Sequence, residues 1–240
     1  MPVADRVHRL GDRYVNWYVI EDGGRLTVLD AGFPVHWAQL PALLRAIGRS
    51  TADVDAVLLT HHHPDHVGNV ERIRREAGAR VLAHEADAPG VRRGGVNPPI
   101  GGVLRALHRP YLARYLAHIA RAGGLRTPAV ADVATFADGE RVDVPGRPRV
   151  IHAPGHTPGS CALHLEARDV LFSGDAIVTL DTATGTVGPA LLAPPFAGDR
   201  AQARASLERL EATRAATLLP GHGEPWRDGV AEAVRRARAG

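Results

Sequence analysis

The hydrophobic positions of this chain follow two spacings, and the spacing changes from one segment to the next. Short apolar runs that end in turn residues predict strands, whereas apolar residues that recur every three or four positions predict helices. The predicted strands are 14–20, 25–29, 54–59, 80–83, 133–136, 141–144, 149–152, 161–165, 169–173 and 217–219. The predicted helices are 37–47, 67–77, 110–121, 200–214 and 224–238. Strands and helices alternate in two blocks, which favours a layered α/β fold. The pattern alone does not say whether the two blocks share one core.

The segment between the two blocks has a different character. Residues 89–102 are rich in glycine and proline, which predicts an irregular loop. The helix 110–121 is amphipathic and begins at a proline, which suits the first turn of a helix. Its apolar face comprises Tyr111, Leu112, Tyr115, Leu116 and Ile119. We therefore treat residues 89–124 as a helical and loop insert between the two blocks.

The composition is that of an ordinary globular protein. The chain has 240 residues, of which 45% are hydrophobic and 23% charged, and this length is ample for a sizeable core. Its apolar runs are too short to cross a bilayer, and the N-terminal residues lack the apolar core of a secretory signal. Cys161 is the single cysteine, which excludes an intrachain disulfide and fits a cytoplasmic location.

The charged residues are distributed unevenly. All basic residues are arginines, so mechanisms that need a lysine amine, such as a Schiff base or a phosphate-loop lysine, are excluded. The net charge is +3, yet residues 88–131 contain seven arginines and no acidic residue. This basic stretch coincides with the insert, so the insert differs from the rest of the chain in charge as well as in pattern.

The residues with the clearest chemistry form a histidine-rich stretch directly after the predicted strand 54–59. His61 and His63 are two positions apart, so in an extended segment both side chains point the same way. Pro64 then turns the chain, and Asp65 and His66 stand at the start of the next helix, where they can face a second point nearby. Imidazole and carboxylate ligands together suit zinc, iron or manganese. The stretch therefore predicts a metal site, and His62, which alternates away from its neighbours, is expected to be a spacer.

A catalytic metal usually has about three protein ligands and an open position, so further ligands are expected elsewhere. Three later residues share one context, in which a strand is followed by a turn of small residues and then by a ligand-type side chain. These residues are His156, Asp175 and His222. Glycine in each turn lets the backbone approach closely, so all three can reach one pocket at the strand ends.

With these motifs the chain resembles the metallo-β-lactamase-fold superfamily of hydrolases. The resemblance extends from the first predicted hairpin, through Asp30-Ala31-Gly32, to Pro220-Gly221-His222-Gly223. It implies a four-layer αββα sandwich with two sheets back to back and helices outside. It also implies one domain over residues 1–240, with the insert 89–124 over the active site.

The resemblance further implies a dinuclear metal centre. Zn²⁺ is the expected ion, with Fe or Mn as alternatives, and a water or hydroxide would lie between two divalent ions. Asp65 would orient this nucleophile or take up its proton, and Asp30 would hold the ligand loops by hydrogen bonds. The implied ligands are His61, His63 and His156 for one ion, Asp65, His66 and His222 for the other, and Asp175 bridging both.

The residue at position 175 narrows the choice among the reactions that this superfamily catalyses. True β-lactamases usually have cysteine or serine here, so Asp175 favours the glyoxalase II, lactonase and phosphodiesterase branches. A glyoxalase II proper would continue after His222 with a helical region that contacts glutathione, and this chain stops soon after that residue. We predict a dinuclear hydrolase of an ester, lactone or thioester carbonyl. The alternatives are phosphodiesterase or β-lactamase activity, and a mononuclear iron persulfide dioxygenase. Against the dioxygenase, residues 176–188 do not match the arginine-containing stretch that those enzymes have after the position of Asp175.

The insert is the expected source of substrate selection. Tyr111 and Tyr115 are candidate substrate-binding residues, because a tyrosine hydroxyl can donate to a developing oxyanion. The apolar face of the helix could contact an acyl chain, and the arginines could steer an anionic small molecule or touch an acidic membrane surface. The alternative is that the helix packs on the core and the arginines are only solvated. Nucleic acid is not expected as a partner, since the chain shows no added nucleic-acid domain, and the sequence predicts no oligomeric state.

Overall fold

The fold is built from two main sheets. The computed structural model describes residues 2–96 and 109–240, so part of the predicted loop 89–102, and Arg105 with it, lies outside the described residues. The first sheet contains, in spatial order, β1 (Pro2–Ala4), β2 (Val7–Gly11), β3 (Asn16–Asp22), β4 (Arg25–Leu29), β5 (Val54–Leu58), β6 (Arg80–His84) and β9 (Ala134–Phe136). The second contains β10 (Arg149–His152), β11 (Cys161–Leu165), β12 (Val170–Gly174) and β15 (Thr217–Pro220).

Smaller elements complete the described chain. Two short sheets pair β13 (Val178–Leu180) with β14 (Val187–Ala190), and β7 (Gly95–Val96) with β8 (Arg126–Thr127). The α-helices are α1 (Gln39–Ala46), α2 (Pro64–Val67), α3 (Val70–Ala77), α4 (Ala88–Arg93), α6 (Pro110–Arg121), α7 (Arg200–Glu211) and α8 (Val230–Ala239). Three short 3-10 helices are η1 (Pro34–Ala38), η2 (Thr51–Asp53) and η3 (Glu166–Arg168).

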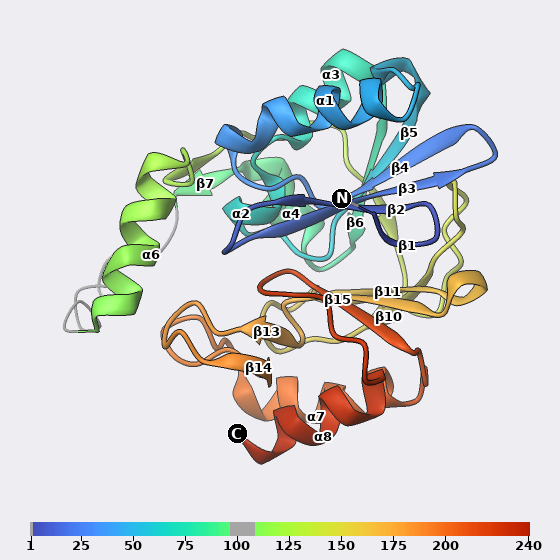
Figure 1. The fold of residues 1–240 in the computed structure, drawn as a ribbon. Helices are drawn as coiled ribbons and strands as arrows, with labels where there is room; N and C mark the ends of the chain where they lie inside the picture. The colour runs from blue at the N-terminus through green and yellow to red at the C-terminus, as the bar shows by residue number, and fades with distance from the viewer. Residues whose placement is uncertain (1, 97–108) are drawn as a thin grey trace.

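The two main sheets pack face to face, with helices on their outer faces (Figure 1). Strand β12 shows how the sequence produces these layers, because its successive side chains point to opposite faces of the sheet. Val170 and Phe172 point into the core between the two sheets. Leu171 points the other way, into the core under α7 and α8. A third core lies between the first sheet and helices α1 and α3. The predicted αββα sandwich is therefore confirmed.

The strand directions place the ends of several strands at one edge of the sandwich. Strands β4, β5, β6 and β9 are parallel neighbours, and so are β12 and β15. Because carboxyl ends of parallel strands meet at the same edge, the loops that follow them gather there. These loops carry Asp30 after β4, the stretch 60–66 after β5, Asp175 after β12 and His222 after β15.

The prediction of a strand at 141–144 was wrong. Val142 and Val144 are buried as the alternation suggested, but they belong to a turn-rich segment rather than to a ladder. The Val144 N–H donates to the Val142 carbonyl, and Gly146 has a φ of 88°, so the chain turns back at once. Strands β1, β2, β13 and β14 lack a clear pattern in the sequence and were not predicted.

Two helix predictions also need correction. The last helix begins at Val230 and not at 224, because Trp226 exchanges two backbone hydrogen bonds of 2.9 Å with Leu218. Gly229, with a φ of 83°, then redirects the chain into the helix. The predicted helix 67–77 begins later, at Val70, and ends at Ala77 as predicted, because Val67 is the last residue of the separate helix α2. The predicted loop 89–102 begins within a helix, α4.

Helix α6 of the insert packs on the body of the protein, at one end of the sandwich (Figure 1). Leu112, Tyr115 and Ile119 are buried in a small apolar cluster with Phe33. A Cβ at Gly124 would lie 2.3 Å from the Phe33 ring, so glycine is required where the helix leaves the cluster. The helix itself is confirmed with its predicted bounds.

A polar clasp of Asp12, His36 and His118 also ties α6 to the body. The Asp12 Oδ2 atom lies 3.2 Å from His36 Nε2 and 2.8 Å from His118 Nε2. The Phe33 N–H donates to His36 Nδ1, so the His36 proton is on Nε2 and is donated to Asp12. Burial raises the pKa of Asp12, but the His36 hydrogen bond and two backbone N–H groups outweigh it and lower the pKa to about 2. These three residues could surround a metal, but this hydrogen-bond pattern favours a clasp.

No helix within residues 2–96 and 109–240 combines the length and the apolar character needed to cross a membrane.

Phe172→Ala should lower the free energy of unfolding by about 3–5 kcal/mol, because it empties a fully buried site between the sheets. Urea denaturation measures this loss. The matched control is Val187→Ala, whose side chain is 83% exposed and which should change stability by less than about 0.5 kcal/mol. Equal effects of the two substitutions would contradict the assignment of the core.

Candidate metal centre

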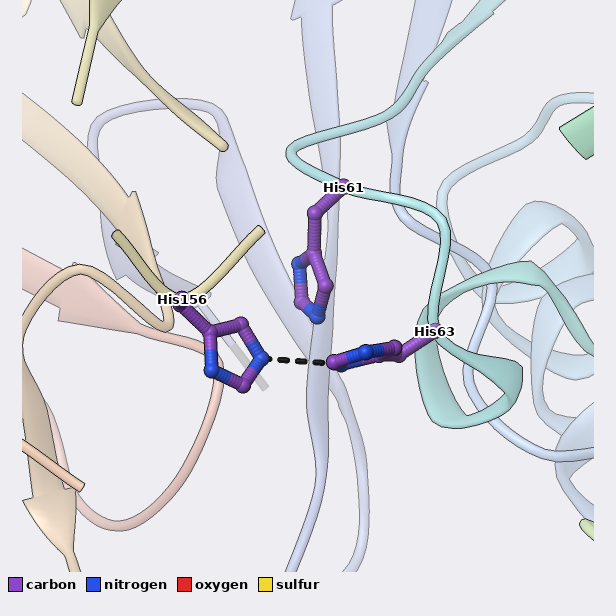
Figure 2. Close-up of side chains that lie close together, drawn as sticks. All are labelled: His61, His63 and His156. Carbon is purple, nitrogen blue, oxygen red and sulfur yellow. Dashed lines mark hydrogen bonds between the residues drawn. The ribbon is translucent and has the colours of Figure 1, made fainter. Parts of the chain in front are cut away.

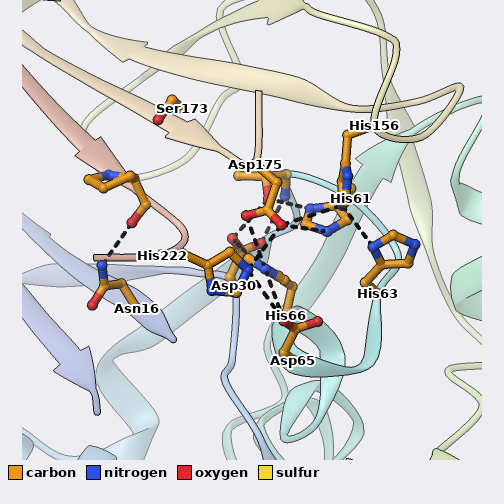
Figure 3. A network of polar contacts seen from close by, with 12 residues as sticks. Asn16, Asp30, His61, His63, Asp65, His66, His156, Ser173, Asp175 and His222 are labelled. Atoms are coloured by element: carbon orange, nitrogen blue, oxygen red, sulfur yellow. Dashed lines mark hydrogen bonds and ion pairs between the residues drawn. The ribbon is translucent and has the colours of Figure 1, made fainter. Parts of the chain in front are cut away.

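The seven residues expected to hold metal come together at the edge where the strands end (Figure 3). Each follows a strand directly or after a short turn, so their backbones are fixed by the two sheets. His61, His66, Asp175 and His222 are buried, and the others are nearly so. The residues are His61, His63, Asp65, His66, His156, Asp175 and His222.

The first group joins two loops from different sheets. His61 and His63 come from the loop after β5, and His156 comes from the loop after β10. Their three rings point toward one another (Figure 2), with His63 Nδ1 at 2.8 Å from His156 Nε2. The ring centres lie 4.6–4.8 Å apart. Their ring nitrogens can therefore surround a single ion.

The second group lies beside the first. Asp65 and His66 stand in the first turn of α2, as predicted, and His222 follows β15. The Asp65 Oδ2 atom is 3.5 Å from His222 Nε2 and 3.8 Å from His66 Nε2. This group offers two imidazoles and one carboxylate.

Asp175 stands between the two groups. Its Oδ2 lies 3.0 Å from His222 Nε2 and 3.3 Å from His156 Nε2, so one oxygen faces both groups. Its Oδ1 lies 3.4 Å from His66 Nε2. The position is the one that a carboxylate bridging two ions would occupy.

Hydrogen bonds on the outer side of the first ligand loop fix how its imidazoles are protonated. The Thr60 N–H and hydroxyl both donate to Asp30, at 2.9 Å. The Thr60 oxygen therefore accepts from His61 Nδ1, 3.1 Å away. His66 Nδ1 donates to Asp30 over 2.8 Å. Both rings consequently direct an Nε2 lone pair at the centre, and Asp30 has the supporting role that its sequence position suggested.

The ligands from the second sheet are oriented in the same way. His156 Nδ1 donates to the Phe196 carbonyl over 2.9 Å. His222 Nδ1 donates to the Tyr14 carbonyl over 2.6 Å. Their Nε2 atoms therefore also face the centre, where His156 Nε2 accepts from His63 Nδ1 and His222 Nε2 contacts Asp175 Oδ2.

This arrangement fits cations. The buried His61 Nε2, His66 Nε2 and Asp175 Oδ1 have no hydrogen-bond partner among the described residues. Lone pairs that face one another in a buried site repel unless a proton or a metal ion lies between them. Imidazole nitrogens and carboxylate oxygens, without thiolates, suit zinc, iron or manganese.

The pKa shifts point to the same need for positive charge. Burial lowers the pKa of His66, but three carboxylates, that of Asp175 foremost, outweigh it and raise the pKa to about 10. Burial, followed by the charge of His156, lowers the pKa of His63 to about 3. The field of the carboxylates therefore favours cations on the His66 side of the centre.

Asp87 connects the two loops of the first group, a contact that was not predicted from the sequence. Its Oδ2 accepts from the His62 N–H at 3.0 Å and from the Thr157 hydroxyl at 2.8 Å. Its Oδ1 accepts from the Gly159 N–H at 2.8 Å. A Cβ at Gly159 would lie 2.6 Å from Asp87, so glycine permits this approach. The Asp-Ala-Pro order marks a helix start, which could have located Asp87 but not its partners.

The prediction that His62 is only a spacer is incomplete. Its ring does point away from the centre, but Nδ1 lies 2.9 Å from Asp87 Oδ2. His62 therefore supports the same carboxylate through its side chain as well as its backbone.

The two tyrosines proposed to bind substrate lie in different places. Burial raises the pKa of Tyr115 well above its usual value, so its hydroxyl keeps the proton and donates to Asp65 Oδ2 over 3.0 Å. Tyr115 lines the pocket that opens onto the centre. Tyr111 is not among the residues that line this pocket, and its ring packs against Tyr14. The structure thus brings only Tyr115 to the site.

Asp87→Asn should weaken metal binding at the His61, His63 and His156 group by about tenfold. The amide would direct N–H groups at backbone and hydroxyl donors, so the two ligand loops would separate. Competition with a chelating dye measures the affinity of each ion. The control is Asp132→Asn on the surface, and unchanged affinities in Asp87→Asn would show that this carboxylate does not hold the loops.

Comparisons with known proteins agree with this geometry. The family model described as the metallo-beta-lactamase superfamily matches residues 10–222. The hydroxyacylglutathione hydrolase of Stenotrophomonas maltophilia is 30% identical over 210 residues, which cover 87% of this chain and 59% of that protein. The acyl-coenzyme A thioesterase MBLAC2 of Gallus gallus is 28% identical over 183 residues, covering 73% of this chain and 61% of that protein.

A solved structure is similar along the whole chain. The metallo-beta-lactamase family protein TTHA1429 from Thermus thermophilus has a TM-score of 0.71 and 27% identity, covering 99% of this chain and 80% of that one. The chain spans 50–59% of the length of the hydroxyacylglutathione hydrolases that it matches. The matched residues include both ends of the ligand set, and on this basis the chain belongs to the metallo-β-lactamase superfamily.

Proposed function

We propose that this protein is a dinuclear metal-dependent hydrolase that cleaves an ester, lactone or thioester carbonyl. The observation that carries the proposal is the position of Asp175, between two groups that each offer three further ligands. One ion would be held by His61, His63 and His156, and the other by Asp65, His66 and His222. When bound, a pair of divalent ions acidifies water and polarises a carbonyl oxygen.

The residues around the centre contribute orientation and a proton acceptor. Burial raises the pKa of Asp65, but His66 and His222 outweigh it and lower the pKa, so the carboxylate is ionised. Among residues 2–96 and 109–240, Tyr115 alone hydrogen-bonds to this carboxylate, through Oδ2. Oδ1 is therefore free to accept the proton that an attacking water loses.

The pocket favours a carbonyl substrate of small size. Its volume is about 200 Å³, and it extends from the ligand residues to an apolar wall. Exclusion of bulk water from such a pocket strengthens the interactions of charged groups with the reacting atoms. Two relatives, a hydroxyacylglutathione hydrolase and an acyl-coenzyme A thioesterase, carry names that describe removal of an acyl group from its carrier, which supports the proposal.

The metal content separates this proposal from an iron-dependent persulfide dioxygenase. We expect two ions of the zinc type per chain, because the seven ligands form two complete groups around Asp175. Elemental analysis of protein equilibrated with zinc, iron and manganese measures the stoichiometry. A single iron per chain, with oxygen uptake in the presence of a persulfide, would favour the dioxygenase.

Asp65→Ala and His156→Ala should each lower kcat/KM at least about 100-fold, because the first removes the proton acceptor and the second a ligand. A screen over thioesters, lactones, phosphodiesters and β-lactams identifies the substrate class for the assay. Asp132→Ala is the surface control, and circular dichroism checks that all variants fold. Activity of both site variants within a few-fold of the unchanged protein would contradict the mechanism.

A further inference from the structure

The chemistry of the pocket allows a narrower statement about the substrate, which rests on the proposed hydrolase function. We infer that the pocket beside the metal centre binds a short, uncharged, apolar acyl group. The inference follows from the composition of the pocket wall, from the positions of the nearby arginines and from the way the wall is fixed in place.

The pocket has two chemically different ends. At one end the candidate ligands His63, Asp65, His156, Asp175 and His222 face the cavity. The rest of the wall is mainly apolar and consists of Phe33, Pro64, Ile119, Leu192, Pro195 and Phe196. A carbonyl carbon at the ligand end would therefore place its acyl carbons along this apolar wall.

No arginine side chain lines the pocket in the described parts of the chain. Two arginines that contact segments of the wall are bound to backbone oxygens, since Arg109 and Arg200 donate to the carbonyls of Pro194 and Leu192, each at 3.4 Å. An acyl group with its own carboxylate would therefore find no arginine partner along the apolar wall among the described residues. Burial of an unpaired charge is strongly unfavourable, so the pocket discriminates against such groups.

The apolar wall is fixed to the ligands, which limits the length of the acyl group. Phe196 contributes its ring to the wall, while its carbonyl accepts from His156 Nδ1 at 2.9 Å. The same ring packs edge-on against Tyr115, with ring centres 5.8 Å apart. Ile119 and Phe33 also line the pocket and belong to the buried cluster of α6. A pocket of about 200 Å³ with walls held in this way has room for a short acyl chain, and a longer chain would extend beyond it.

The test compares acyl thioesters of N-acetylcysteamine on the metal-loaded, full-length protein. From acetyl to hexanoyl, kcat/KM should rise about fourfold per methylene, and it should fall again by dodecanoyl. The butanoyl thioester should exceed the succinyl thioester, which has the same four carbons and one added charge, by at least roughly tenfold. A succinyl or dodecanoyl thioester that is hydrolysed as well as the butanoyl or hexanoyl one would overturn the inference.

Ile119→Ala tests the wall directly. It should raise the dodecanoyl-to-hexanoyl ratio of kcat/KM about tenfold, because it lengthens the pocket. Leu192→Ala tests the same point from another segment, should Ile119→Ala fail to fold. Val187→Ala is the exposed control and should leave the ratio unchanged. An unchanged ratio in a folded Ile119 or Leu192 variant would also overturn the inference.

A binding measurement separates failure of this inference from failure of the proposed function. Calorimetry should show that butanoate binds the metal-loaded protein at least roughly tenfold more tightly than succinate does. Hydrolysis of none of the thioesters, esters or lactones would contradict the proposed function. The ratio of butanoate to succinate binding would still decide the inference, and equal affinities would count against it.

Discussion

The structure of the centre depends on electrostatic repulsion between groups that the fold holds close together. Four imidazoles donate their Nδ1 protons outward, to Thr60, Asp30 and the carbonyls of Tyr14 and Phe196. Their Nε2 atoms are consequently directed at the centre, and those of His61 and His66 have no hydrogen-bond partner among the described residues. Positive charge at the centre relieves the repulsion, so the fold and the binding of cations are energetically coupled.

The outer contacts show how two sheets build one centre. Asp30 joins the loop after β5 to α2, since it accepts from Thr60 and from His66. Asp87 joins that same loop to the loop after β10. Phe196 orients His156 with its carbonyl and forms part of the pocket wall with its ring. The positions of the ligands and of the substrate wall are therefore set by shared residues, and neither can shift alone.

The sequence predicted the parts of the molecule whose signals are local. The four-layer sandwich, helix α6 and the grouping of the seven candidate ligands could be read from periodicity, turn residues and the resemblance to a family. The strand expected at 141–144 failed because pairing there is limited to an isolated bridge between Arg141 and Arg149, after which the chain turns. Asp87 and the Phe196 carbonyl were missed because their partners are 70 and 40 residues away, and no local pattern encodes such contacts.

In addition to its apolar packing, helix α6 makes polar contacts with the body through two residues that are one turn apart. Tyr115 donates to Asp65 Oδ2, and His118 contacts Asp12 in the clasp. The first contact uses a carboxylate of the metal centre, so a cation bound there competes with the tyrosine hydroxyl for the same oxygen. Coupling between two binding events is reciprocal. If a cation at Asp65 weakens the docking of α6 by some factor, docking of α6 weakens the affinity for that cation by the same factor. Through Tyr115, helix α6 thus shares a carboxylate with any cation that binds beside Asp65.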